Sequence, residues 1–113
     1  MPYRKGDVIL VPFDVTDRSG VKLRPAVVVS GDDYNQQTPD IVIASITGNL
    51  TALPHPGDRR LTDWNAAGLL RPSLAQSKLA TIERTLIKRT LGTLTATDLA
   101  ALEQGLREAL DLK

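Results

Sequence analysis

The sequence has 113 residues, of which 14 are Lys or Arg and 13 are Asp or Glu, so its formal net charge is only +1. This length favours one domain, residues 1–113, large enough to bury a core. The lack of cysteine excludes disulfides and thiolate metal sites, and no apolar run approaches the roughly 20 residues that span a bilayer. The charged N-terminal segment is unlike a secretory signal, so we expect a cytoplasmic protein without membrane contact.

Three apolar runs in the first half of the sequence predict strands. They cover residues 8–11, 26–29 and 41–46, and β-branched residues dominate them. The intervening segments are polar and contain glycine or proline. Residues 14–22 predict a loop, residues 31–39 predict turns without helical periodicity, and residues 48–58 predict a second long loop.

The second half predicts three more strands and one helix. Strands are expected at residues 59–62, 73–82 and 87–91, the first of them at a sheet edge. Thr95 is the expected N-cap of the helix, with Asp98 completing a variant of the capping box. Gly105 should weaken this helix by about 1 kcal/mol relative to alanine. The helix carries an apolar stripe at helical spacing, made by Leu99, Leu102, Leu106 and Leu110.

This order of elements predicts a mainly β protein with a helix (α+β). Several short strands followed by one terminal helix favour a small, partly open β-barrel with the helix packed on it. Basic residues concentrate in its second half, since residues 59–92 contain seven Lys or Arg and two acidic residues, a net charge of +5. Such a segment either forms a face that binds polyanions or protects strand edges, and charge alone does not decide between these interpretations.

Two polar side chains at strand ends form the candidate site. Pro25 cannot donate a backbone hydrogen bond and holds the residue before it in an extended conformation, so Arg24 lies at the beginning of a rigid strand. Thr47 ends another buried strand, directly before Gly48. The alternatives are an arginine that pins a loop to a carboxylate and an ordinary strand-end threonine.

These residue types indicate chemistry on phosphate groups without a metal or cofactor. His55 is the only histidine, so with no cysteine there is no plausible ligand set for zinc or iron. A guanidinium binds phosphate oxygens through two charged hydrogen bonds and can stabilise the charge that develops in phosphodiester transfer. If the substrate is RNA, its own 2′-hydroxyl can be the nucleophile.

Several short motifs occur in an order that is characteristic of one family. The chain resembles the MazF/PemK toxins of toxin–antitoxin systems over nearly its whole length. The residues that carry this resemblance are Lys5-Gly6-Asp7-Val8, Arg24-Pro25-Ala26-Val27-Val28-Val29-Ser30, Ile43-Ala44-Ser45-Ile46-Thr47, Arg71-Pro72-Ser73, Lys78-Leu79-Ala80-Thr81-Ile82-Glu83 and Leu91-Gly92-Thr93-Leu94.

The resemblance implies a fold, an activity and partners. The fold would be an SH3-like barrel of the PemK/CcdB type that forms a homodimer. The activity would be metal-independent cleavage of single-stranded RNA at short sequences, with Arg24 and Thr47 as the catalytic pair and a 2′,3′-cyclic phosphate and a 5′-hydroxyl as products. A cognate antitoxin would silence the toxin and form a DNA-binding complex with it.

Further residues are candidates for binding the RNA. Only 4% of the residues are aromatic, so little stacking on bases is expected, and hydrogen bonds and arginines should read a short sequence. The candidate substrate-binding residues are Lys22, Ser45, Asn49, Arg59, Arg60 and Lys78.

Two other functions stay open. Barrels related to this family act by binding DNA gyrase instead of cutting RNA, and a catalytically inactive family member would have the same motifs. A module for proline-rich peptides is disfavoured, because such modules need an aromatic-lined groove.

Overall fold

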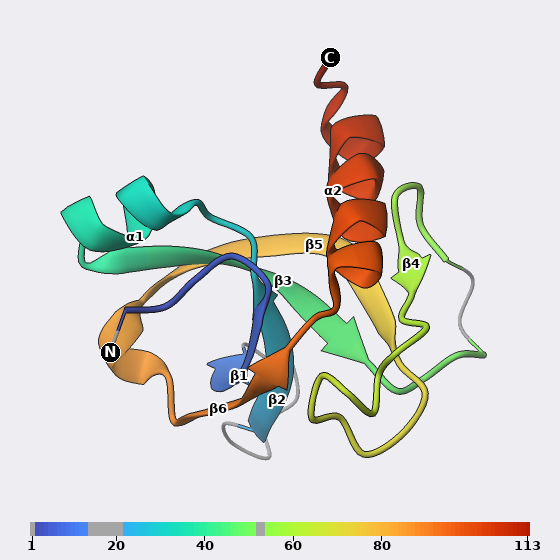
Figure 1. Ribbon diagram of the computed structural model, residues 1–113, viewed down its shortest axis with the longest axis horizontal. Coiled ribbons are helices and arrows are strands. Elements are labelled where there is room, and N and C mark those ends of the chain that lie inside the picture. Colours follow the sequence, from blue (N-terminus) through green and yellow to red (C-terminus); the bar gives the residue numbers. More distant parts are fainter. Residues whose placement is uncertain (1, 14–21, 52–53) are drawn as a thin grey trace.

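The strands form one curled antiparallel sheet in the computed structural model, which describes residues 2–13, 22–51 and 54–113. The sheet order is β4-β5-β3-β2-β1-β6, so β4 and β6 are the two edges and the barrel stays open (Figure 1). The expected partly open barrel with a C-terminal helix is therefore confirmed. The strands are β1 (Asp7–Phe13), β2 (Lys22–Val28), β3 (Asp40–Thr47), β4 (Arg59–Arg60), β5 (Leu74–Glu83) and β6 (Arg89–Thr93).

All six strands occur where the sequence predicts them, within a few residues. The largest difference is in β2, which begins at Lys22 instead of Ala26 because residues 22–25 still pair with β1. The edge strand β4 is shorter than expected, with two residues. The predicted loop at residues 14–22 lies, apart from Lys22, outside the described residues.

Two hydrophobic clusters lie on opposite sides of the sheet. Neighbouring residues of one strand alternate between them, as Val8 and Ile9 of β1 do. The larger cluster is covered by α2 (Ala96–Leu110), through the fully buried Leu102 and the partly buried Leu99 and Leu106. The predicted stripe ends there, because Leu110 is 51% exposed. Among the described helices, none combines the length and the apolar content needed to cross a membrane.

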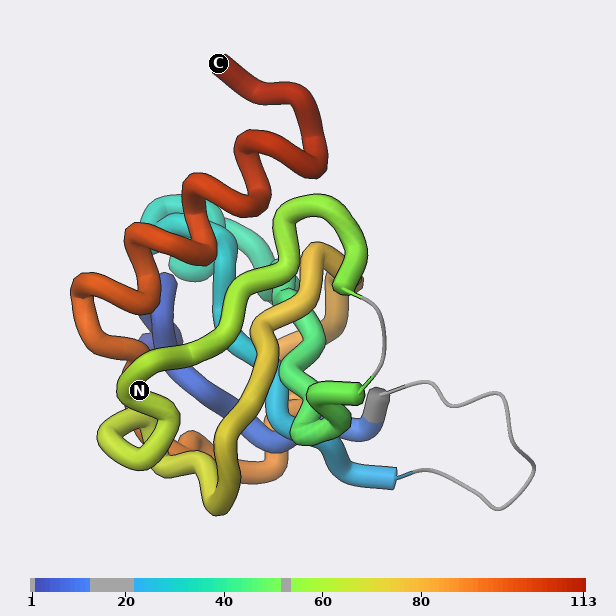
Figure 2. The backbone as a smooth tube through the Cα atoms, turned by 90° about the vertical axis from the view of Figure 1, so that its right-hand side faces the viewer, coloured from blue at the N-terminus to red at the C-terminus, as the bar shows by residue number. Residues whose placement is uncertain are grey.

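Gly105 is explained by packing of α2 against another segment. A Cβ atom at position 105 would lie 2.1 Å from the carbonyl oxygen of Gly57, which itself has φ +90°. The two backbones are therefore in direct contact, and Figure 2 shows α2, in red, against the segment that leads to β4, in light green. Glycine weakens the helix locally, but here it permits the close approach.

A short helix, α1 (Asp32–Gln37), was not predicted. The expectation of turns alone at residues 31–39 is wrong for this segment. The helix has six residues, too few to show an apolar stripe, and its buried residue is polar: the Asn35 amide donates to the carbonyl oxygens of Tyr3 and Ser30, both at 3.1 Å. A 3₁₀ turn, η1 (Arg84–Leu86), follows β5, and the Arg84 guanidinium donates to the carbonyl oxygens of Asn35 and Thr38. Hydrogen bonds with distant segments therefore stabilise α1, which sequence periodicity cannot reveal.

Candidate functional site

Arg24, the third residue of β2, stands opposite Thr47, the last residue of β3. The two strands are paired with Ala26 opposite Ser45 and Val27 opposite Ala44, and the same register, continued by two residues, places Arg24 opposite Thr47. The pairing stops at Ala26 because Pro25 has no N–H to donate. Arg24 is exposed and Thr47 is half-buried, so both side chains reach the surface.

The turn after β3 fixes the hydroxyl of Thr47. Its oxygen accepts a hydrogen bond from the backbone N–H of Asn49 at 3.1 Å, which leaves the O–H proton available to a ligand. The side-chain oxygen of Asn49 in turn accepts from the backbone N–H of Thr51 at 3.1 Å and from its hydroxyl at 2.7 Å. The turn is therefore closed by local hydrogen bonds, and the hydroxyl is held in one place.

Both residues line one open cavity of about 620 Å³. Its polar lining includes Thr47, Asn49, Ser73 and three arginines, whereas none of the described residues that line it is acidic. The apolar part of the lining consists of Leu10, Pro25, Ile46, Leu69, Leu70 and Leu91. A ligand that combines negative charge with flat apolar groups matches this lining, and a nucleotide chain has both properties.

Two of the cavity arginines, Arg71 and Arg89, were absent from the candidate residues. Arg89 lies at the start of β6, opposite Leu10 of β1, and Arg71 lies in the segment between β4 and β5. The concentration of basic residues in the segment 59–92 was the available signal, but it did not show which of its seven cations face the site.

Backbone packing brings the segment with Arg71 to the cavity. Gly68 has φ +85°, and a Cβ atom there would lie 2.1 Å from the carbonyl oxygen of Leu91. A Cβ atom at Gly92 would lie 2.4 Å from the carbonyl oxygen of Ala67. Two glycines thus let this segment cross β6 in backbone contact, which fixes the residues that follow Gly68.

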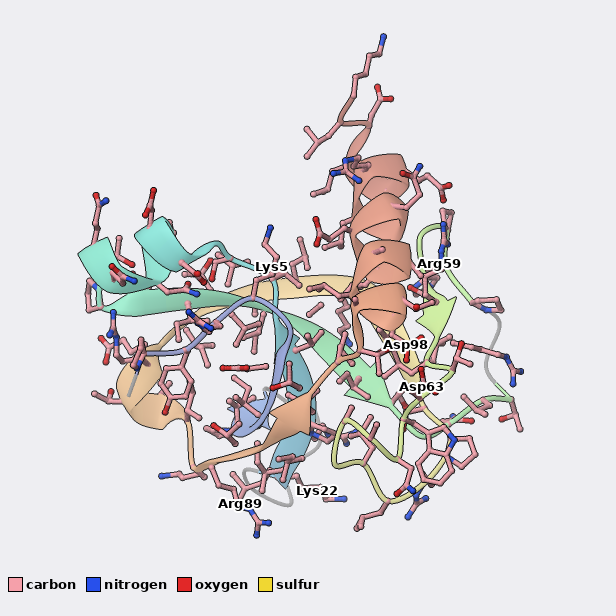
Figure 3. The ribbon with its side chains drawn as sticks, viewed as in Figure 1. Lys5, Lys22, Arg59, Asp63, Arg89 and Asp98 are labelled. Carbon is pink, nitrogen blue, oxygen red and sulfur yellow. The ribbon has the colours of Figure 1, made fainter. Side chains whose placement is uncertain are left out.

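Of the predicted substrate-binding residues, only Asn49 lines this cavity. Ser45 is nearly buried within the sheet and is absent from the lining. Lys22, Arg60 and Lys78 are exposed outside it. In Figure 3, Lys22 and Arg89 lie at the end of the sheet away from α2, whereas Arg59 lies beside α2.

Arg59 is engaged in an ion pair. Its Nη2 atom lies 2.8 Å from Oε2 of Glu108 on α2, and Nη1 donates to the carbonyl oxygen of Asp58 at 3.1 Å. The hydrogen bond and the charge of Arg59 lower the pKa of the exposed Glu108 carboxyl below its ordinary value. This arginine therefore holds β4 and α2 together in the described structure.

Asp98 has a different role from the one that the capping box predicts. Thr95 is the N-cap and its hydroxyl accepts from the backbone N–H of Asp98 at 3.3 Å, as expected. The buried Asp98 carboxylate, however, accepts from the backbone N–H groups of Thr62 and Asp63 at 2.9 and 2.8 Å. It thus ties the first turn of α2 to the start of the segment that carries Arg71, below the base of the helix in Figure 3.

The described side chains give no cluster suited to a metal ion. No group of three or more His, Asp or Glu residues within residues 2–13, 22–51 and 54–113 is arranged to hold one. His55 lies in an exposed loop, where its backbone N–H donates to Asp58 at 2.8 Å.

Comparison with known proteins identifies the family. Residues 4–110 match the model of the PemK-like, MazF-like toxins of type II toxin–antitoxin systems. The chain belongs to this family. The family match confirms the resemblance that the sequence motifs indicate. No curated protein matches the sequence of this chain.

Solved structures of low sequence identity have the same fold. A mycobacterial endoribonuclease in complex with its cognate antitoxin is 21% identical with a TM-score of 0.77, covering 100% of this chain and 98% of that one. The Mycobacterium tuberculosis toxin MazF-mt6 is 20% identical with a TM-score of 0.76, covering 95% and 98%. The Deinococcus radiodurans MazE–MazF structure is 20% identical with a TM-score of 0.77, covering 100% of both chains.

Proposed function

We propose that this PemK/MazF-like toxin is a metal-independent endoribonuclease that cleaves single-stranded RNA at short sequences. The observation that carries the proposal is the cavity in which Arg24 and Thr47 meet two further arginines and no described acidic side chain. An apolar lining with three guanidiniums suits a chain of bases and phosphates. Family membership supports the same substrate class, since structures of this fold include endoribonucleases.

The proposed reaction needs only positioning and charge stabilisation from the protein. The 2′-oxygen of the RNA forms a bond to phosphorus while the bond to the 5′-oxygen breaks, which leaves a 2′,3′-cyclic phosphate and a 5′-hydroxyl. Water accepts the proton of the 2′-hydroxyl, and water donates a proton to the departing 5′-oxygen. Because a guanidinium presents a fixed fork of charged N–H donors, we assign Arg24 to binding the phosphoryl oxygens as their negative charge grows. The O–H of Thr47, directed by the Asn49 bond, donates to one of the same oxygens.

The proposal includes two protein partners. Relatives of this fold were crystallised with an antitoxin, as the mycobacterial and Deinococcus complexes were, and we propose that a cognate antitoxin binds this chain. We also propose a homodimer, as the family resemblance implies. Cellular RNA is available in the cytoplasm, which is where this activity would operate.

An RNA cleavage assay in EDTA tests the activity. A long RNA of mixed sequence is incubated with wild-type protein, with Arg24→Ala, and with Arg107→Ala as a control that removes an exposed arginine of α2. We expect discrete fragments from the wild type and the control. The Arg24→Ala rate should be lower by about 10²-fold or more, since losing one preplaced donor to a developing oxyanion costs about that much.

The ends of the fragments test the chemistry. Cyclic phosphates, detected by their resistance to phosphatase until acid opens the ring, are the expected termini. Intact RNA with the wild type would contradict the proposal, and trapped DNA breaks in a gyrase assay would then indicate the protein-binding alternative. Cleavage that disappears in EDTA and returns with a divalent metal would contradict the metal-independent mechanism.

A further inference from the structure

Arg71 rests directly on the backbone that follows Thr47. A Cβ atom at Gly48 would lie 2.6 Å from Cδ of Arg71, 3.2 Å from Cγ and 3.5 Å from Nε. The aliphatic part of the arginine therefore occupies the space that a side chain at position 48 would take. The stem of Arg71 thus packs against the backbone of Gly48, and the residue lines the same cavity as Arg24 and Thr47.

The segment that carries Arg71 is fixed at both ends. At its start, the Asp98 carboxylate accepts from two backbone N–H groups, as described above. At its end, the Ser73 hydroxyl donates to the carbonyl oxygen of Arg71 at 2.9 Å, and the carbonyl oxygen of Ser73 accepts from the N–H of Leu61 at 3.0 Å. Together with the backbone contact of Gly68 with β6, these hydrogen bonds fix the backbone position of Arg71.

Its charge is available to a ligand. Arg71 is exposed and lines the cavity, and across the described ranges no carboxylate forms an ion pair with it. Arg59 differs in this respect, because Glu108 already neutralises it. A guanidinium that is held in place beside a catalytic hydroxyl, without a described counter-charge, suits a second anionic group of the substrate.

We propose that Arg71 is a substrate-binding residue that holds the phosphate next to the one that is cleaved, so this inference rests on the proposed nuclease function. Arg24 of β2 and Thr47 at the end of β3 face each other and share the reacting phosphate. Arg71 packs against Gly48, the residue that follows Thr47. Since every nucleotide carries one phosphate, an RNA strand that runs past Thr47 brings its next phosphate to Arg71.

The experiment separates binding from cleavage. Wild-type cleavage sites are mapped first, and a short RNA with one site is then prepared twice, once unmodified and once with a 2′-deoxy nucleotide at the cleaved position, which removes the nucleophile. Kd for the deoxy RNA and kcat and KM for the cleavable RNA are measured for wild type, Arg71→Gln, Arg71→Lys and the control Arg107→Gln. We expect Arg71→Gln to raise Kd and KM about 10- to 100-fold, the size of one charged hydrogen-bond pair, with kcat nearly unchanged and partial rescue by lysine.

The salt dependence identifies the group that Arg71 contacts. Losing one contact with a single-stranded phosphate should reduce the slope of log K against log salt concentration by about 0.7. A weaker affinity with an unchanged slope would assign Arg71 to a base and overturn the proposal. Unchanged Kd in Arg71→Gln, with normal cleavage by the wild type, would overturn it as well.

Gly48→Ala tests the packing of the Arg71 stem against the backbone at position 48 without removing the positive charge. The new methyl group must displace the arginine stem, so Gly48→Ala should also raise Kd. In the Arg71→Ala background no stem is left to displace, so Gly48→Ala should raise Kd much less there than in the wild type. Equal costs in both backgrounds would contradict the packing argument. If the wild type leaves every RNA intact, the proposed function fails and this inference falls with it; a failure confined to the Arg71 variants overturns the inference alone.

Discussion

The hydroxyl of Thr47 is the smallest functional group on which the proposed mechanism depends. Its oxygen already accepts from the N–H of Asn49, so its remaining contribution is the O–H proton. A hydroxyl that is fixed in this way loses little freedom when it donates to a phosphoryl oxygen, which is the property of a preorganised donor.

Replacing Thr47 by valine and by serine separates the donor from the shape. Thr47→Val keeps the branched side chain and removes the proton, and we expect the cleavage rate to fall by about 10²- to 10³-fold. Thr47→Ser keeps the hydroxyl and should retain most of the rate. Single-turnover cleavage at saturating protein measures both. Equal rates for the two variants would show that the hydroxyl has no part in the reaction.

Among the individual residues of the candidate site, the sequence predicted some and not others. Arg24 and Thr47 could be found because proline and glycine mark the strand ends where they stand, and the structure brings both to one cavity. Arg71 and Arg89 could not be singled out, because their placement follows from the backbone contact of Gly68 with Leu91 and from the pairing of β1 with β6. Arg59 shows the reverse case, since its ion-pair partner Glu108 is 49 residues away in the sequence.

Among the elements, α2 shows how packing reverses an expectation from helix propensity. The sequence alone treats Gly105 as a weak point, and Gly105→Ala should then stabilise the protein by about 1 kcal/mol. In the structure the added methyl group would collide with the carbonyl oxygen of Gly57, an atom of the backbone that cannot rotate away.

We therefore predict that Gly105→Ala destabilises the protein, by roughly 1–3 kcal/mol as overpacking commonly does. Urea unfolding measures the change in the free energy of unfolding. Gly31→Ala is the matched control, because nothing lies within 4 Å of its added Cβ, and it should change stability little. A more stable Gly105→Ala protein would mean that α2 and the segment before β4 are not in contact.

Some of the helices and strands can be predicted from a single sequence, and others cannot. The six strands and α2 were predictable because apolar runs and an N-cap signal are local patterns. The helix α1 was not, since its anchor is the buried amide of Asn35, which bonds to Tyr3 and Ser30. The second partners of Asp98 were also hidden, because Thr62 and Asp63 lie more than 30 residues before it.

At the scale of the whole molecule, the central strands contribute side chains to both hydrophobic clusters and so connect them. In β1, β2 and β3, neighbouring residues enter opposite clusters, as Val27 and Val28 do. Its radius of gyration is 13.3 Å, close to the value of about 13 Å expected for one compact domain of this length. No strand in the centre of the sheet can separate without opening both clusters.

We therefore predict one cooperative unfolding transition for residues 1–113. Fluorescence of Trp64 reports on the cluster beneath α2, against which this residue packs, and far-ultraviolet circular dichroism reports on the helices and strands of the whole chain. The two signals should give the same urea midpoint. Two separate midpoints would show that the cluster around Trp64 unfolds independently of the rest of the secondary structure.

The same unfolding curves test the proposed homodimer. Folding that is coupled to association is favoured by mass action, so the midpoint of a dimer rises with protein concentration, whereas that of a monomer stays constant. We expect a rising midpoint, with both signals moving together. A constant midpoint at all concentrations, together with an elution volume of a single chain, would contradict the proposed dimer.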